Sequence, residues 1–193
     1  GELIIDNNDV AASYNALTEL SPTGDNLNNF SQVTIRNYGN LSIRQNDTLS
    51  FSLANIVGEA SSSAFLTISN ATNVTFPNPF SLSGNYTLNL DTPISAAGNW
   101  TITSGSALSH NVNYNSETYK LDLTLNGNLT INSGGAINVD GMGFAGGQGP
   151  GTSATYWDGA SYGGRGGDKF ADYTVGPTYG SVTNPTSLGS GGH

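Results

Sequence analysis

The sequence predicts an all-β protein folded as a right-handed parallel β-helix, and three observations support this prediction. One short motif recurs along the 193 residues, an aliphatic residue follows each copy at a fixed offset, and polar uncharged residues take the place of charged ones. Short strands that end in polar corners cannot form a core alone, so they must stack on neighbouring units.

The recurring motif reads glycine, asparagine, apolar, hydroxyl, apolar. It occurs, once without the glycine, at Gly39–Ile43, Asn73–Phe76, Gly84–Leu88, Gly98–Ile102 and Gly127–Ile131. Six residues beyond each copy comes a further aliphatic residue: Leu49, Leu82, Ile94, Leu108 and Ile137. Alternating apolar and hydroxyl residues give a strand one inward face. We therefore expect the closing positions to be buried: Ile43, Phe76, Leu88, Ile102 and Ile131.

The spacing of the copies is uneven, with starts separated by 33, 12, 14 and 29 residues. Hexapeptide solenoids and propellers have fixed periods, whereas a parallel β-helix accepts corner loops of different lengths. About five coils are expected between residues 30 and 140, with two or three short strands in each. The leading Gly-Asn supplies the backbone freedom that a corner requires.

Residues 9–20 show a helical rather than a strand pattern. Asp9 can act as the N-cap, and Pro22 ends the segment. The residues expected on its apolar face are Val10, Tyr14, Leu17 and Leu20. We expect a capping segment over about 1–25 that contains this helix and shields the first coil; an ordinary loop helix is the alternative.

From Gly141 to His193 the composition changes, because these 53 residues hold 16 of the 26 glycines. Flexible linkers are poor in aromatic residues, yet this segment has seven: Phe144, Tyr156, Trp157, Tyr162, Phe170, Tyr173 and Tyr179. We expect an ordered, irregular lobe over 141–193 that belongs to the same domain as the β-helix of 1–140. No apolar capping segment closes the sequence, so we also expect the native chain to continue.

The lobe contains three glycine-rich blocks, at Gly143–Gly151, Gly159–Gly167 and Tyr179–Ser181 with Pro185–Gly192. In their composition and in the order of their blocks, residues 121–193 resemble the glycine-rich blocks of very large bacterial and archaeal cell-surface proteins. In those proteins such blocks are inserted in β-helical stretches. The resemblance implies a cell-surface location and carries over no activity or catalytic residue.

The charge and the absence of cysteine narrow the function classes. Only five basic residues oppose fourteen acids, giving a net charge of −9. A basic patch for phosphate binding cannot be assembled, so no nucleic-acid partner is expected. The chain has no cysteine and no apolar run long enough for a membrane span. We expect an extracellular protein whose export signal has been removed or omitted.

Two candidate binding sites lie in the lobe. Aspartates between glycine turns can converge on calcium, and the candidate ligands are Asp140, Asp158, Asp168 and Asp172. Solvated turn carboxylates, with no cofactor, are the default interpretation. Aromatic rings can stack on sugars, and the candidates are Tyr156, Trp157, Tyr162 and Tyr173; these rings could equally form the core of the lobe.

Eight Asn-x-Ser/Thr sequons occur, but five are the repeat itself, because its pattern satisfies the acceptor rule. The remaining three are the glycosylation candidates: Asn29, Asn46 and Asn70.

These features predict a non-catalytic structural module of a cell-surface stalk or filament, which contacts the continuing chain or neighbouring subunits. A carbohydrate- or partner-binding adhesin module, with cell-surface glycans as ligands, is the first alternative. A polysaccharide lyase or hydrolase is the second. Catalysis is not predicted, since the strands have almost no basic residues and the acids are scattered rather than paired.

Overall fold

A computed structural model describes residues 1–10, 17–20, 27–44, 48–50, 55–59, 64–69, 73–169 and 175–192. Its contacts divide the chain into two compact units. Unit 1 comprises Gly1–His110 and Leu121–Asn138, and unit 2 comprises Asn111–Lys120 and Val139–His193. The expected boundary at 140 falls close to the last crossing between the units. Residues 111–120, expected within the β-helix, belong instead to unit 2.

All the strands that the structure describes lie in unit 1, and each strand is short. Their bounds are β1 (Glu2–Asp6), β2 (Thr18–Glu19), β3 (Gln32–Arg36), β4 (Asn40–Arg44), β5 (Thr48–Ser50), β6 (Ile56–Val57), β7 (Phe65–Ser69), β8 (Asn73–Thr75), β9 (Phe80–Leu82), β10 (Thr87–Leu90), β11 (Ile94–Ala97), β12 (Trp100–Ile102), β13 (Ala107–Ser109), β14 (Leu123–Asn126), β15 (Leu129–Ile131) and β16 (Ala136–Ile137). Every pairing between these strands is parallel.

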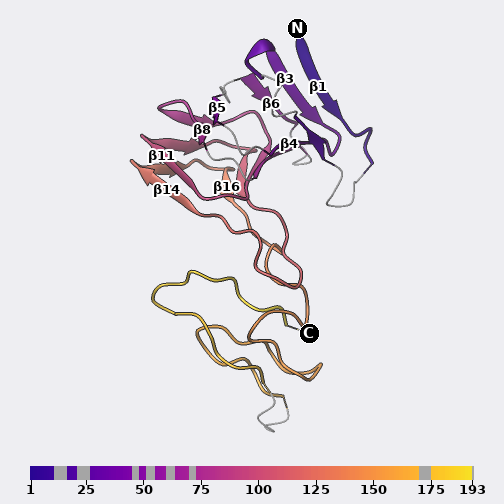
Figure 1. Ribbon diagram of the computed structural model, residues 1–193, viewed down its shortest axis with the longest axis vertical. Coiled ribbons are helices and arrows are strands. Elements are labelled where there is room, and N and C mark those ends of the chain that lie inside the picture. The colour runs from indigo at the N-terminus through magenta and orange to yellow at the C-terminus, as the bar shows by residue number, and fades with distance from the viewer. Residues whose placement is uncertain are drawn as a thin grey trace. The chain divides into compact units, whose positions relative to one another are not determined.

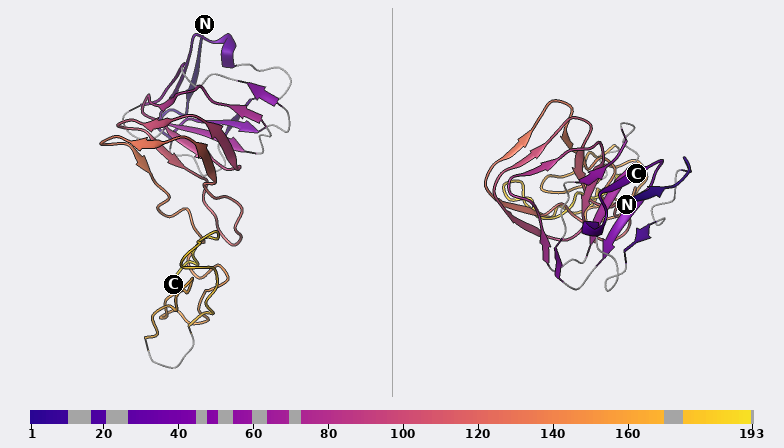
Figure 2. Two further views of the ribbon diagram at one scale, coloured as in Figure 1. Left: turned by 90° about the vertical axis from the view of Figure 1, so that its left-hand side faces the viewer. Right: turned by 90° about the horizontal axis from the view of Figure 1, so that it is seen from above.

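The strand order shows a circuit of three strands. From β3 onward, successive pairings join strands three places apart along the chain, as in the series β4, β7, β10, β13 and β16, but among the described strands the series is interrupted between β6 and β9 and between β8 and β11. The other sheets have the orders β1-β3-β6, β9-β12-β15, β5-β8 and β11-β14. Figure 1 shows β11 beside β14 and β5 beside β8, and Figure 2 shows the strands of unit 1 from two further directions. Unit 1 is therefore all-β and parallel, and compatible with a β-helix-like fold.

The core consists of aliphatic side chains stacked in register from circuit to circuit. In the six-stranded sheet one column contains Leu41, Leu66, Leu88 and Leu108, all with no exposed surface. A second column contains Ile43, Ile68 and Leu90, which are also fully buried. Each circuit thus removes the apolar face of the preceding circuit from water, which is the main stabilising term for such a stack.

The repeat marks corners, and these corners lead into different sheets. Gly84 and Asn85 precede β10 and both have positive φ, of 99° and 60°, a backbone region that glycine and asparagine tolerate best. Gly127 precedes β15 for a different reason: a Cβ there would lie 2.2 Å from the carbonyl oxygen of Gly98, at the same corner of the previous circuit. The glycine of the motif therefore serves a turn in one copy and a close backbone approach in another.

The predicted helix over 9–20 is wrong where the structure describes it. Thr18–Glu19 is strand β2, paired with β4, and Asp9 has positive φ instead of the extended backbone of an N-cap. Residues 11–16 of the predicted helix lie outside the described residues. The capping segment expected over 1–25 is also different, because β1 pairs in register with β3 as part of a sheet. Apolar residues spaced by three or four positions occur in helices and also in short strands separated by turns. Here the parallel pairing with β4 makes Thr18–Glu19 a strand.

Four of the five closing positions of the repeat are buried in the core or packed against it, and one is exposed. Ile43, Leu88 and Ile102 are fully buried. Phe76 is half-buried against the core, with its ring centroid 4.7 Å from that of Trp100. Ile131 is 46% exposed, so its predicted burial is wrong. It pairs with Ile102 in the last circuit, and no described strand covers its other side.

Replacing these two isoleucines separates sequence pattern from burial. Ile102→Asp should lower the free energy of unfolding by about 3 kcal/mol or more, because a carboxylate would enter the apolar stack without a partner. Ile131→Asp should cost about 1 kcal/mol or less in the monomer, since water reaches that position. Chemical denaturation of dilute monomers measures both values. Equal losses would contradict the assigned exposure of Ile131.

A polar cluster joins β1 to the turn after β3. The Arg36 Nε lies 2.7 Å from Asp6 Oδ2, and the backbone N–H of Asn8 and the side chain of Asn37 donate to Oδ1. These bonds stabilise the charged form, so the pKa of Asp6 is lowered to about 2, with the Asn8 N–H as the largest cause. The carboxylate is exposed, and its role is to hold the edge of the sheet rather than to fill the core.

Because of the Asp6 cluster, the free energy of unfolding of unit 1 depends on pH. A lowered folded-state pKa contributes stability above the unfolded pKa of 3.8, and this contribution is lost as the pH falls through about 2. Asp6→Asn should therefore be less stable than wild type at neutral pH, and the difference should shrink as the pH falls from 4 towards 2. Urea denaturation across that range measures it. A difference that stays constant with pH would show that the charge of Asp6 contributes nothing.

Candidate functional site

The last circuit of unit 1 presents apolar side chains to water. Leu129 and Ile137 are 37% and 44% exposed, and Ile131 is exposed to a similar degree. The strands that contain these residues nevertheless have the same sequence pattern as the strands of the buried circuits. The partner of each residue one circuit earlier is buried: Trp100 for Leu129, and Leu108 for Ile137. What differs is the absence of a further circuit among the described residues. We call β14, β15 and β16 the terminal circuit.

The terminal circuit is hollowed on its inner side. A groove of about 340 Å³ is lined by Leu121, Leu123, Leu125, Gly127, Leu129 and Ile137. All these residues belong to unit 1, and the five large ones are aliphatic. In the described part of the chain, each terminal strand also pairs on one side only. An apolar groove beside unpaired strand edges is a surface that favours the addition of further strands.

The four aspartates predicted to bind calcium are not brought together where the structure describes them. Asp158 is buried, and its carboxylate accepts the backbone N–H of Lys169 at 3.0 Å and the hydroxyl of Thr155. Asp168 lies 3.7 Å from Arg165, Asp140 is exposed, and Asp172 is outside the described residues. Among the described residues no group of three or more His, Cys, Asp or Glu side chains could hold a metal ion. Calcium binding stays a prediction.

The four predicted sugar-binding aromatics separate into different environments. Tyr156 and Trp157 are 75% and 64% exposed, and the Lys169 ammonium lies 4.1 Å from the Trp157 ring centroid. Tyr162 is half-buried and packs edge-to-face on Tyr179, with centroids 5.0 Å apart. Tyr173 lies outside the described residues. The exposed pair is thus a candidate platform, while Tyr162 fits the alternative interpretation as a core residue.

Of the three candidate glycosylation sites, the structure describes one. Asn29 is exposed at the end of the 3-10 turn η1 (Leu27–Asn29), so its amide has room for a glycan. Asn46 and Asn70 lie outside the described residues.

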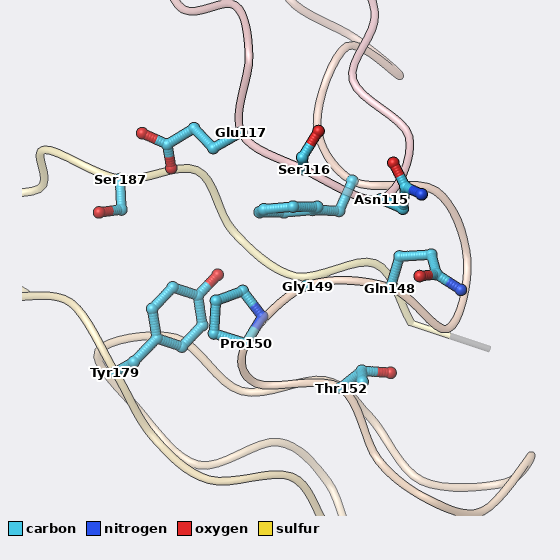
Figure 3. Close-up of a pocket in the computed structure, with 10 residues that line it drawn as sticks. Asn115, Ser116, Glu117, Gln148, Gly149, Pro150, Thr152, Tyr179 and Ser187 are labelled. Carbon is cyan, nitrogen blue, oxygen red and sulfur yellow. The ribbon is translucent and has the colours of Figure 1, made fainter.

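Unit 2 contains a pocket that the sequence analysis did not predict (Figure 3). It has a volume of about 490 Å³, within the range of small-molecule sites. Figure 3 shows Tyr179 and Pro150 on one side and Asn115, Ser116 and Glu117 on the other. The remaining lining residues are Phe144, Gln148, Gly149, Thr152 and Ser187. We call these ten residues the unit 2 pocket.

Hydrogen bonds link the three segments that line the unit 2 pocket, 115–117, 144–152 and 179–187, and one of them runs from the backbone N–H of Gly151 to the Ser190 hydroxyl at 2.8 Å. Glu117 accepts the backbone N–H of Leu188 at 2.8 Å and lies 3.4 Å from Lys120, which donates to the Thr186 carbonyl at 3.1 Å. The Tyr179 hydroxyl donates to the Leu188 carbonyl and accepts from Ser190 at 3.0 Å. These bonds fix Glu117 and Tyr179 in the pocket wall, which reduces the ordering cost of ligand binding at those two residues.

The unit 2 pocket could not be predicted from the sequence, because the residues that line it come from segments that are distant in sequence. Residues 111–120 separate β13 from β14 and bring Asn115, Ser116 and Glu117 to the glycine-rich segment. The available signal was the 29-residue interval between the Gly98 and Gly127 copies, which exceeds the two preceding intervals of 12 and 14 residues. The 33-residue interval between the first two copies lies within unit 1, however, so interval length alone does not identify an insertion.

Comparison with known protein families, with curated proteins and with solved structures found no match. In the described part of the chain, no helix is long and apolar enough to cross a membrane.

The environment of Asp158 indicates a structural role that can be measured. Asp158→Ala should destabilise the loop from 155 to 169 by about 1–2 kcal/mol, because a part-buried N–H and a part-buried hydroxyl would lose their acceptor. The matched variant Asp168→Ala removes a partly exposed ion pair and should cost about 1 kcal/mol or less. Hydrogen exchange of the Lys169 amide reports the difference. Equal protection in both variants would contradict this role for Asp158.

Proposed function

We propose that the chain is a non-catalytic structural module of an extracellular stalk or filament, folded as a right-handed parallel β-helix, which assembles through its terminal circuit. The observation that supports this proposal most directly is the exposure of Leu129, Ile131 and Ile137 beside unpaired strand edges. An acidic, cysteine-free composition rich in hydroxyl and amide residues is consistent with an extracellular setting.

The chemistry of the terminal circuit favours one kind of covering group, another circuit of short parallel strands. Within unit 1, Ile131 covers Ile102, and Ile137 covers Leu108, each in register across a parallel pair. A further circuit with aliphatic residues at the same positions would cover Ile131 and Ile137 in the same way. It would also provide hydrogen-bond partners for the backbone groups on the edge of β15 that does not face β12.

The opposite end of the stack offers a complementary edge. Among the described strands, β1 pairs with β3 and β2 pairs with β4, each on one side only. Because all pairs are parallel, stacking β1 of one copy on β15 of another would continue the parallel arrangement of the strands. Such a head-to-tail contact uses two different surfaces, so repeated contacts produce a filament rather than a closed dimer.

A second candidate function, glycan binding as part of an adhesin, is favoured by the exposure of Tyr156 and Trp157. Aromatic rings exposed to this degree commonly mark interaction sites. The polysaccharide lyase or hydrolase alternative has less support, since the unit 2 pocket contains one carboxylate, Glu117, and glycoside hydrolysis ordinarily requires two.

Self-association of the isolated chain tests the assembly proposal, because only a second copy can then supply the covering circuit. Light scattering after size exclusion should show a mass that rises with concentration. Ile131→Asp should abolish this rise, since a carboxylate would be buried at the contact. Thr130→Asp, on the same strand but with its side chain alternating to the other face, should associate as wild type does.

A wild-type chain that remains monomeric at every concentration, or two variants that behave alike, would contradict assembly through the terminal circuit. Immunogold electron microscopy of intact cells tests the extracellular location separately. Labelling confined to the cell interior would exclude a surface stalk.

A further inference from the structure

We propose that the unit 2 pocket binds a neutral oligosaccharide, and that this site is distinct from the exposed Tyr156–Trp157 pair. The inference is independent of the terminal circuit, because every lining residue belongs to unit 2. It therefore adds a ligand site to a module that is proposed to assemble through unit 1.

The pocket has the apolar surface that a sugar ring requires. Phe144 and Tyr179 are half-buried, and Pro150 lies beside Tyr179 at the pocket wall (Figure 3). A pyranose ring has one face of C–H groups, and the negative faces of aromatic rings attract these groups. The Tyr179 ring is held in place, because its hydroxyl is bonded to Leu188 and Ser190.

The polar groups of the pocket match sugar hydroxyls. Asn115 and Gln148 are exposed, and within the described part of the chain their side-chain amides are not committed to hydrogen bonds. Each amide offers both donors and an acceptor, as a hydroxyl-rich ligand requires. The hydroxyls of Ser116 and Thr152 also lie on the wall; they are bonded to the Thr118 hydroxyl and the Ser153 carbonyl, and each retains acceptor capacity. Apolar surface with a few convergent polar groups is the usual composition of a small-ligand site.

The charge of the pocket favours a neutral sugar over an acidic one. No Arg or Lys lines it, and its one carboxylate, Glu117, is already bonded to Lys120 and the Leu188 N–H. An anionic sugar would find no cation on the wall and would approach a chain with a net charge of −9. The lone, fully engaged carboxylate also makes the pocket a binding site rather than a hydrolytic one.

Calorimetric titration with neutral tetrasaccharides tests the proposal, using β-1,4-linked glucose, α-1,4-linked glucose, α-1,6-linked mannose and β-1,4-linked N-acetylglucosamine as probes. We expect saturable binding of at least one probe. Gln148→Ala should weaken that binding about tenfold, because the ligand would lose its amide partner. Asn184→Ala, which removes an exposed amide of unit 2 outside the pocket, should leave the affinity unchanged.

Three outcomes would overturn the proposal. The first is no saturable binding of any probe by a folded chain, and the second is an unchanged affinity in Gln148→Ala. The third is a loss of affinity in Trp157→Ala, which would place the sugar on the exposed pair. A proline-rich peptide is the comparison ligand, and its binding in place of the sugars would assign the pocket to protein recognition. Ile131→Asp should bind the sugar normally, so failure here is distinguishable from failure of assembly.

Discussion

The structure of unit 1 depends on one constraint, that each circuit must be covered by the next. A strand of three to five residues buries little apolar surface by itself, and a single circuit has no interior. The column of leucines from Leu41 to Leu108 is fully buried because each of the four strands that contain these leucines has a paired strand on both sides. The exposed terminal circuit, the need for glycine where corners stack, and the polar bonds that secure β1 are consequences of this requirement.

The same constraint explains what the sequence could predict and what it could not. Alternation and the fixed offset identify which side chains point inward, and Ile43, Leu88 and Ile102 are buried as their pattern indicates. Ile131 has the same local pattern. Its burial depends on whether a further strand covers it, and the local sequence does not encode this. The apolar residues on either side of β2, Leu17 and Leu20, belong to a helical spacing in sequence, yet parallel pairing with β4 makes Thr18–Glu19 a strand, as tertiary context often overrides local preference.

Unit 2 is ordered by different means. Apart from the bridge between Gly146 and Gly191, its described residues form no strand or helix, so polar bonds and close glycine contacts replace a sheet. The buried Ser161 hydroxyl donates to the Gly176 carbonyl at 2.7 Å and accepts the Gly166 N–H at 3.0 Å. Composition indicated an ordered lobe through its aromatic residues. It could not show which rings, such as Tyr162 and Tyr179, pack together and which remain in water.

The chain crosses between the two units three times, and this connectivity sets the order in which their parts are synthesised. Residues 111–120 leave unit 1 after β13, the terminal circuit follows, and the rest of unit 2 comes afterwards. During synthesis, Glu117 therefore precedes its partner Leu188 by about 70 residues, and the residues of the terminal circuit are synthesised in between. The terminal circuit is consequently an excursion of the chain that begins and ends in unit 2, and unit 2 is complete only after residues 121–138 have been synthesised. In this nested connectivity the backbone joins the edge of the β-stack to the glycine-rich unit at both ends of the terminal circuit.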